Sequence, residues 1–311
     1  MKSRVSPASV RAALAALVLT MIVGSSQPPW AANSGWQGVG DSLVSDFKYV
    51  ANNLEADGED IVTAPLDLDA AAALLANPRF YLVLGGAGAA FGGSFALDQT
   101  MRRHLHNMSS STASTLENIS YGSVGAATAL LYGYGLYAGE ARARQYALTA
   151  GEGAGIAVLL DIGIKAAFGR LRPSQDHHDH DAFFHGGQTF VSGDVAPLFA
   201  LACGVSEYYD NRWYVALPAY SLALLDGFGR MGHDAHWFSD VVGAALLGVG
   251  TTELFLHLHR RHEEHPWRFR IFPMPQPAVP AAKGVFPVTA AGARRARRDP
   301  MPAGLVVAFW W

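Results

Sequence analysis

The chain has 311 residues, of which 50% are hydrophobic and only 16% are charged, against roughly 25% charged residues in an average soluble protein. This composition excludes an intrinsically disordered chain, which needs low hydrophobicity and high charge. The formal net charge of -3 at pH 7 shows no excess of basic residues of the kind that binds nucleic acid, so we expect no nucleic-acid partner. The single cysteine, Cys203, excludes an internal disulfide and a cysteine-based zinc site.

Residues 1–32 are predicted to be a signal peptide. Lys2, Arg4 and Arg11 are basic, and an apolar run from Ala12 to Gly24 follows them. This run is shorter than the about 20 residues that span a bilayer, which favours a cleaved peptide over an anchor. An uncleaved N-terminal anchor is the alternative. We therefore expect an exported protein, either periplasmic or membrane-associated.

The rest of the chain divides into three parts. Residues 33–66 are mixed and polar, which predicts a linker or a peripheral segment. Residues 67–265 show successive helical patterns and are predicted to form the main domain. In residues 266–311, short β-prone runs separated by Pro, Gly and Arg predict a tail with short strands. The expected fold class is therefore all-α, a helical bundle core with a short β-prone C-terminal tail.

Local signals set the expected helix boundaries. Ser114 to Glu117 has the form of a capping box, which predicts a helix from there to Gly139. A second helix is expected from Ala141 to Phe168, because Gly169 and Pro173 follow it. Further helices are expected at Val195 to Glu207, Tyr214 to Leu225 and Trp237 to Arg261.

The sequence leaves membrane contact open. Ile119 to Gly139 carries no charge and is long enough to cross a bilayer, and Phe80 to Leu97 is borderline. Both stretches are rich in Gly, Tyr and Ser rather than in Leu and Ile, and acidic residues interrupt the other helices. A soluble or peripheral helical globule and an integral membrane bundle are both compatible with this pattern.

Two cations follow each other at the end of the second expected helix. Lys165 lies in its last turn, and Arg172 comes after the helix has ended at Gly169. An ammonium and a guanidinium aimed at one point suit the oxygens of a tetrahedral oxyanion. The alternative is a basic helix C-terminus that the helix dipole favours.

A second segment, Ser192-Gly193-Asp194, precedes an apolar helix. We expect an N-cap turn there, with backbone N–H groups pointing outward as an anion-binding nest. The alternative is a plain helix cap.

The third segment contains His236 and Asp240, one helical turn apart and therefore on one face. A carboxylate in that place can hold the proton of one imidazole nitrogen and leave the other nitrogen as a nucleophile or base. Such a pair is also found as metal ligands or as a surface ion pair.

Taken together, the three segments resemble the motifs of the type 2 phosphatidic acid phosphatase superfamily, which also contains the vanadium haloperoxidases. Lys165, six residues and then Arg172-Pro173 match the first motif. Arg230, five residues, His236, three residues and Asp240 match the third, although Gly229 stands where Ser is usual. The resemblance covers roughly residues 120 to 255.

This resemblance implies a phosphatase that acts on phosphomonoesters or pyrophosphates and forms a phosphohistidine intermediate. His236 would be the nucleophile, and Asp240 would fix its tautomer. The implied scheme needs no metal and no cofactor. The phosphoryl oxygens would be held by positive side chains and by backbone groups, at Lys165, Arg172, Arg230, Ser192 and Gly193.

The middle motif departs from the family pattern, since Val191-Ser192-Gly193-Asp194 stands where Pro-Ser-Gly-His is usual. The missing histidine is the general acid of the family. An aspartate at its reference pKa of about 3.9 is mostly ionised at neutral pH and cannot donate a proton. Either Asp194 acts in an acidic medium, or His233 or Asp234 supplies the proton, or the site turns over poorly.

Four functions therefore remain in view. The first is an exported acid phosphatase whose substrate is a phosphate ester, with a phospholipid among the candidates. The others are a weakly catalytic protein that binds phosphate or lipid, a vanadate-dependent haloperoxidase, and a structural helical protein, which leaves the three motifs unexplained. For the histidine-rich stretch Asp176 to Asp181, a solvated loop is favoured over a metal site.

Overall fold

The structure is a computed structural model that describes residues 39–63, 75–176 and 181–264. The predicted signal peptide and the predicted strands of the tail lie outside these residues. The described part of the chain contains helices and no strand, which confirms the all-α fold class. The helices are α2 (Val39–Thr63), α4 (Pro78–Phe95), α5 (Asp98–Leu105), α6 (Ser110–Ala138), α7 (Ala141–Phe168), α8 (Val195–Tyr208), α9 (Trp213–Gly232) and α10 (Phe238–Glu264).

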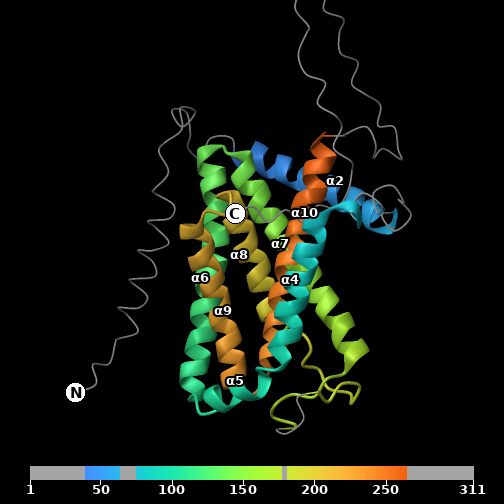
Figure 1. The fold of residues 1–311 in the computed structure, drawn as a ribbon. Coiled ribbons are helices and arrows are strands. Elements are labelled where there is room, and N and C mark those ends of the chain that lie inside the picture. Colours follow the sequence, from blue (N-terminus) through green and yellow to red (C-terminus); the bar gives the residue numbers. More distant parts are fainter. Residues whose placement is uncertain (1–38, 64–74, 177–180, 265–311) are drawn as a thin grey trace, which may run out of the picture.

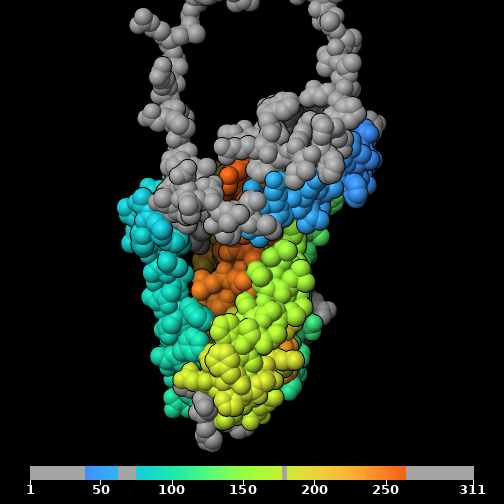
Figure 2. Space-filling model, turned by 90° about the vertical axis from the view of Figure 1, so that its right-hand side faces the viewer, coloured from blue at the N-terminus to red at the C-terminus, as the bar shows by residue number. Residues whose placement is uncertain are grey.

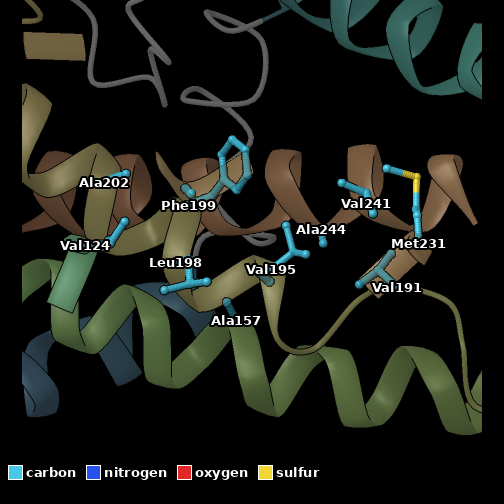
Figure 3. Packing of buried hydrophobic residues seen from close by; sticks show 12 residues of the cluster. Val124, Ala157, Val191, Val195, Leu198, Phe199, Ala202, Met231, Val241 and Ala244 are labelled. Atoms are coloured by element: carbon cyan, nitrogen blue, oxygen red, sulfur yellow. The ribbon is translucent and has the colours of Figure 1, made fainter. Parts of the chain in front are cut away.

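Helix α8 is the centre of the bundle and packs against α6, α7, α9 and α10. Its side chains Val195, Leu198 and Phe199 are buried against small residues such as Ala157 of α7 and Ala244 of α10 (Figure 3). Alanines at these contacts let the helix backbones approach closely. In Figure 1 the long helices run side by side, and α2 lies across one end of the bundle.

Helix α7 has the predicted bounds, and it ends at Gly169, which adopts the left-handed conformation with φ of 51°. The predicted start of α6 is wrong, because the helix begins at Ser110. The side chain of Ser109 accepts the backbone N–H of Thr112 at 3.2 Å and caps the helix there. Glu117, the expected partner in the capping box, instead points toward Arg230.

Helix α2 lies within the segment predicted to be a linker or peripheral. It is amphipathic, but the face that packs against the bundle is the polar one. Its polar side chains face the bundle: Asp46 forms an ion pair with the buried Arg144 of α7 at 3.0 Å. Its apolar side chains Leu43, Phe47 and Leu54 are exposed. The polar composition of this segment therefore reflects a charged interface with the bundle.

Two of the described helices, α7 and α10, are long and apolar enough to cross a membrane. Helices α4 and α5 would make a third span if the pair, bent by 56°, is counted as one. Helix α6 is not among them, because Gly, Ser and Tyr lower its hydropathy. In Figure 2, α10 is visible between α4 and α7, so part of its surface is open on this side of the described bundle.

Candidate active site

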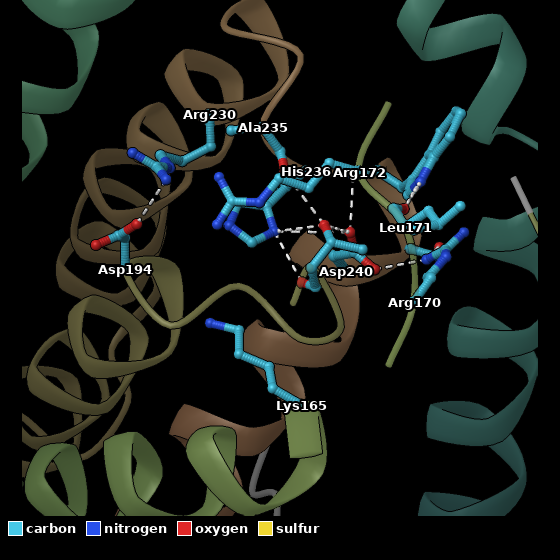
Figure 4. A network of polar contacts seen from close by, with 12 residues as sticks. Lys165, Arg170, Leu171, Arg172, Asp194, Arg230, Ala235, His236 and Asp240 are labelled. Carbon is cyan, nitrogen blue, oxygen red and sulfur yellow. Dashed lines mark hydrogen bonds and ion pairs between the residues drawn. The ribbon is translucent and has the colours of Figure 1, made fainter. Parts of the chain in front are cut away.

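The three sequence segments meet at the end of the bundle opposite α2. Lys165 lies in the last turn of α7, and Arg230 in the last turn of α9. His236 lies just before α10, and Asp194 just before α8. Figure 4 shows the side chains of Lys165 and Arg172 extending toward the region that contains the His236 ring, whereas the guanidinium of Arg230 is turned toward Asp194.

The His236 imidazole is held through one nitrogen. Nδ1 lies 2.9 Å from the carbonyl oxygen of Thr189, which can only accept a hydrogen bond. Nδ1 therefore carries the proton, and the lone pair of the neutral ring is on Nε2. No hydrogen bond from a described residue reaches Nε2. This arrangement leaves Nε2 available to a reactant.

Asp240 does not hold the ring directly, which corrects the role expected for it. Its Oδ2 is 3.6 Å from Nδ1 of His236, too far for a hydrogen bond. The carboxylate instead accepts the hydroxyl of Thr189 at 2.7 Å and the backbone N–H of Trp237 at 2.8 Å. Asp240 thus positions Thr189, and the carbonyl of Thr189 positions the ring.

Arg170 is the main structural residue that sequence reasoning missed. It is completely buried and forms ion pairs with Asp98 at 2.7 Å and with Asp240 at 2.5 Å. Its guanidinium also lies 5.0–5.6 Å from the ring centres of three aromatic residues, a cation–π arrangement, contributed by Phe95, Phe183 and Trp237. Arg170 therefore links the start of α5 to the start of α10 beneath the His236 ring.

Lys165 lies beside the Ser192-Gly193 turn. Its Nζ donates to Asp161 at 2.7 Å. A Cβ atom added to Gly193 would lie 3.0 Å from this Nζ and 2.5 Å from the Asp161 carboxylate. A side chain here would therefore displace the ends of the Lys165 and Asp161 side chains from their present positions.

The expected nest of outward-pointing backbone groups is not present at Ser192. Its N–H donates to the carbonyl of Asp240 at 3.2 Å and is not available to a ligand. The reason is that the turn packs against the start of α10. The hydroxyl of Ser192 is buried and has no hydrogen-bond partner among the described residues. If Ser192 contacts a bound anion, the hydroxyl is the group that does so.

Asp194 occupies the N-cap position of α8, but its side chain makes no capping hydrogen bond. The carboxylate pairs with Arg230 at 3.0 Å and accepts the hydroxyl of Tyr121 at 3.1 Å. Burial, followed by the charges of Asp226 and Asp194, raises the pKa of Tyr121 well above its usual range, so the phenol remains a donor. Asp194 is therefore the anionic partner in a polar cluster between α6, α8 and α9.

This cluster also contains Asp226 and Glu117. Burial, reinforced by the charges of Asp194 and Glu117, raises the pKa of Asp226 to about 7. Glu117 lies 3.9 Å from Arg230. A side chain at Gly229 would collide with Glu117 and with the backbone of α6, which explains why glycine replaces the serine usual there.

Arg172 differs from the other two cations. Within the described residues its guanidinium forms no ion pair, whereas Lys165 pairs with Asp161 and Arg230 pairs with Asp194. Arg172 therefore offers its full charge to a bound anion.

The two alternative proton donors are engaged in other contacts. His233 lies 3.7 Å from Glu117, and Asp234 accepts two hydrogen bonds from Arg102, at 3.1 and 3.2 Å. The Arg102 pair fixes the Asp234 carboxylate at the turn between α9 and α10.

Comparisons with known proteins agree with this site. The family model described as "PAP2 superfamily" matches residues 146–264, which include all three motifs. A lipid A 1-phosphatase of Porphyromonas gingivalis is 35% identical over 92 residues. That alignment covers 29% of this chain and 18% of the relative. Among solved structures, none matches the chain significantly. The family match, the helical bundle and the three motifs agree: residues 146–264 of this chain are similar to the PAP2 superfamily, the type 2 phosphatidic acid phosphatases.

Proposed function

We propose that this protein is a phosphatase that cleaves phosphomonoesters or pyrophosphates through a phosphohistidine at His236. The observation that carries the proposal is the orientation of the His236 ring. Its Nδ1 is held by Thr189 while no described residue engages Nε2, the side chains of Lys165 and Arg172 extend toward the ring, and Arg230 is paired with Asp194 nearby. This combination supplies a nucleophile together with charges that stabilise the transferring phosphoryl group.

In the proposed reaction Nε2 attacks phosphorus, and the N–P bond forms as the P–O bond to the leaving group breaks. Lys165, Arg172 and Arg230 hold the three phosphoryl oxygens, on which negative charge is spread in the transition state. Water then cleaves the N–P bond and releases phosphate, which restores the neutral imidazole. The leaving oxygen needs a proton in the first step unless it is a good leaving group.

We assign this proton to Asp194. In the structure its carboxylate is paired with Arg230. A phosphate ester that binds Arg230 removes this counter-ion and brings negative charge close to Asp194, and both changes favour the protonated carboxyl. The proposal therefore implies an acid phosphatase, with a pH optimum below neutrality.

For the substrate we propose a phosphate ester carried by a lipid, handled by an exported, membrane-associated protein. Two helices have the length and hydropathy of membrane spans. The related protein of P. gingivalis is named for the removal of a phosphate from lipid A. Export is supported by the basic residues and the apolar run within residues 1–32.

The test is phosphate release by the purified protein in detergent, measured across pH with a lipid phosphate in mixed micelles and with a soluble aryl phosphate. The wild type is expected to hydrolyse both, with a preference for the lipid, and His236→Ala neither. His104→Ala, which changes an exposed histidine on α5, should behave as the wild type. Equal rates for His236→Ala and wild type would refute the proposal.

A second function is favoured by the Asp194–Arg230 ion pair. Because this pair occupies one of the three cations, the protein would bind phosphate and turn it over poorly. In that case isothermal titration calorimetry would detect binding of inorganic phosphate, abolished in Arg172→Ala, while neither ester releases phosphate at any pH.

A further inference from the structure

A second polar cluster lies at the end of the bundle that is remote from His236, where α2 crosses α7 and α10 (Figure 1). Asp57 of α2, Glu152 of α7 and His259 of α10 meet there. His259 follows Asp240 by 19 residues on the same helix, which corresponds to about 28 Å along the helix axis. The cluster therefore has no part in the chemistry proposed above.

The candidate ligand atoms of this cluster lie close enough together to share one metal ion. Nε2 of His259 lies 2.8 Å from Oδ2 of Asp57 and 3.5 Å from Oε2 of Glu152. The three ligand atoms all lie within 4.8 Å of one another. Around a tetrahedral ion with bonds of about 2.1 Å, neighbouring ligand atoms are about 3.4 Å apart. Small side-chain adjustments would thus bring all three atoms to one ion.

The charges of the cluster are not balanced by the protein. Asp57 is 2% exposed, and its Oδ1 has no hydrogen-bond partner among the described residues. Both carboxylate oxygens of Glu152 are also buried without a hydrogen bond. No Lys or Arg of the described residues lies within ion-pair distance of either group. Besides His259, the imidazole of His262 lies 3.7 Å from Oδ1 of Asp57. Two buried carboxylates beside imidazoles alone are costly unless a cation joins them.

The His259 ring is already oriented for metal binding. Its Nδ1 lies 2.8 Å from the hydroxyl of Tyr49 and 3.0 Å from that of Thr149. In this structure Nε2 carries the proton and donates it to Oδ2 of Asp57 at 2.8 Å, and a hydroxyl donates to Nδ1. A bound metal ion would take the place of the Nε2 proton, and Nδ1 would then be protonated and donate to one of the two hydroxyls. A histidine that ligates a metal commonly donates its other N–H to such a partner, which fixes the tautomer and the ring plane.

We propose that Asp57, Glu152 and His259 bind one divalent transition-metal ion, of which Zn²⁺ is the best match. One imidazole and two carboxylates suit Zn²⁺ or Mn²⁺, whereas Ca²⁺ and Mg²⁺ prefer oxygen ligands alone. The ion would fix α2 to the bundle, because its ligands come from three different helices. It is a structural site, independent of the phosphatase proposal.

The experiment compares zinc binding by wild-type protein and by two variants, after dialysis against a chelating resin and addition of Zn²⁺. The double variant Asp57→Asn, Glu152→Gln removes both charges and keeps the side-chain shapes. Asp60→Asn is the matched control, because Asp60 also links α2 to a histidine of α10, His262 at 3.2 Å, but is not a proposed ligand.

We expect about one tightly bound zinc per chain in the wild type and in Asp60→Asn, measured by mass spectrometry of the metal. The double variant should lose more affinity than the roughly 10–100-fold that removal of an outer-shell partner costs. Zinc should also raise the melting temperature of the wild type and not that of the double variant. Absence of zinc from the wild type, or equal zinc affinity in the wild type and the double variant, would refute the proposed site.

X-ray absorption on the zinc-loaded wild type keeps the test decisive if the double variant does not fold. We expect one imidazole nitrogen and otherwise oxygen ligands. Two or more imidazoles would contradict the proposed ligand set.

Discussion

Asp194 and Arg230 form an ion pair with a separation of 3.0 Å. Asp194 stands at the position where the type 2 phosphatidic acid phosphatases usually have the histidine that acts as general acid. The pair joins the start of α8 to the last turn of α9. A neutral histidine in this place would leave Arg230 with only Glu117 as an anionic partner, at 3.9 Å, whereas the aspartate supplies a second charge that an incoming phosphate must displace. Catalysis by this chain should therefore depend on Asp194 in two ways, through the proton it donates and through the cation it holds.

Replacement of Asp194 by Asn should separate these two effects. The amide cannot donate the proton of an acid, so alkyl phosphates should lose roughly 10²–10⁴-fold in kcat. Aryl phosphates with good leaving groups need little protonation and should be much less affected. Asp194→His should move the pH optimum toward neutrality. Asp210→Asn, which breaks the exposed Asp210–Arg142 ion pair, is the control. Unchanged hydrolysis of alkyl phosphates by Asp194→Asn would show that the acid lies elsewhere.

Replacement of Arg170 by Met should lower both stability and turnover. The change leaves Asp98 and Asp240 buried without their cation, and breaking a buried ion pair costs about 3–5 kcal/mol. Because Asp240 positions Thr189, the His236 ring should also lose its orientation. Thermal unfolding and kcat measure the two effects, with Arg142→Met as an exposed control. A variant that is less stable but has wild-type kcat would assign Arg170 to folding alone.

The buried carboxyl of Asp226 should make stability depend on pH. Burial raises its pKa from 3.8 to about 7, so between these values the folded state binds a proton that the unfolded state releases. The contribution of Asp226 is therefore fully present below pH 3.8 and is lost as the pH rises to about 7. The shift corresponds to a few kcal/mol, at about 1.4 kcal/mol per pKa unit.

Asp226→Asn cannot titrate, and its stability relative to wild type should rise between pH 4 and pH 7. Denaturant unfolding in detergent at a series of pH values measures this difference. A difference that is constant over the range would contradict the raised pKa.

The sequence predicted the parts of the site that are close together along the chain. Lys165 and Arg172 are recognisable because Gly169 ends α7 between them, and His236 and Asp240 because they are one helical turn apart. Their convergence followed from the family resemblance rather than from local patterns. Thr189, which orients the ring, gave no signal because its contacts join residues 46 to 51 positions apart.

The same limit explains the wrong start predicted for α6. Ser114 to Glu117 has the residue types of a capping box, yet Glu117 lies near Arg230 on another helix. Residues 33–66 were predicted to be a linker or peripheral segment because they are polar, and nothing in the sequence indicated that α2 would pair its polar face with partners such as Arg144. From the sequence alone, polar residues that pair with another helix cannot be distinguished from polar residues that are exposed to solvent.

The most direct test of the account is to trap the phosphoryl group on the protein. Wild-type protein is mixed with a radiolabelled aryl phosphate, quenched within one turnover, digested and analysed by mass spectrometry. We predict a base-stable, acid-labile adduct on Nε2 of His236, absent from His236→Ala. An adduct on any other residue, or turnover by wild type without an adduct while His236→Ala remains active, would contradict the account.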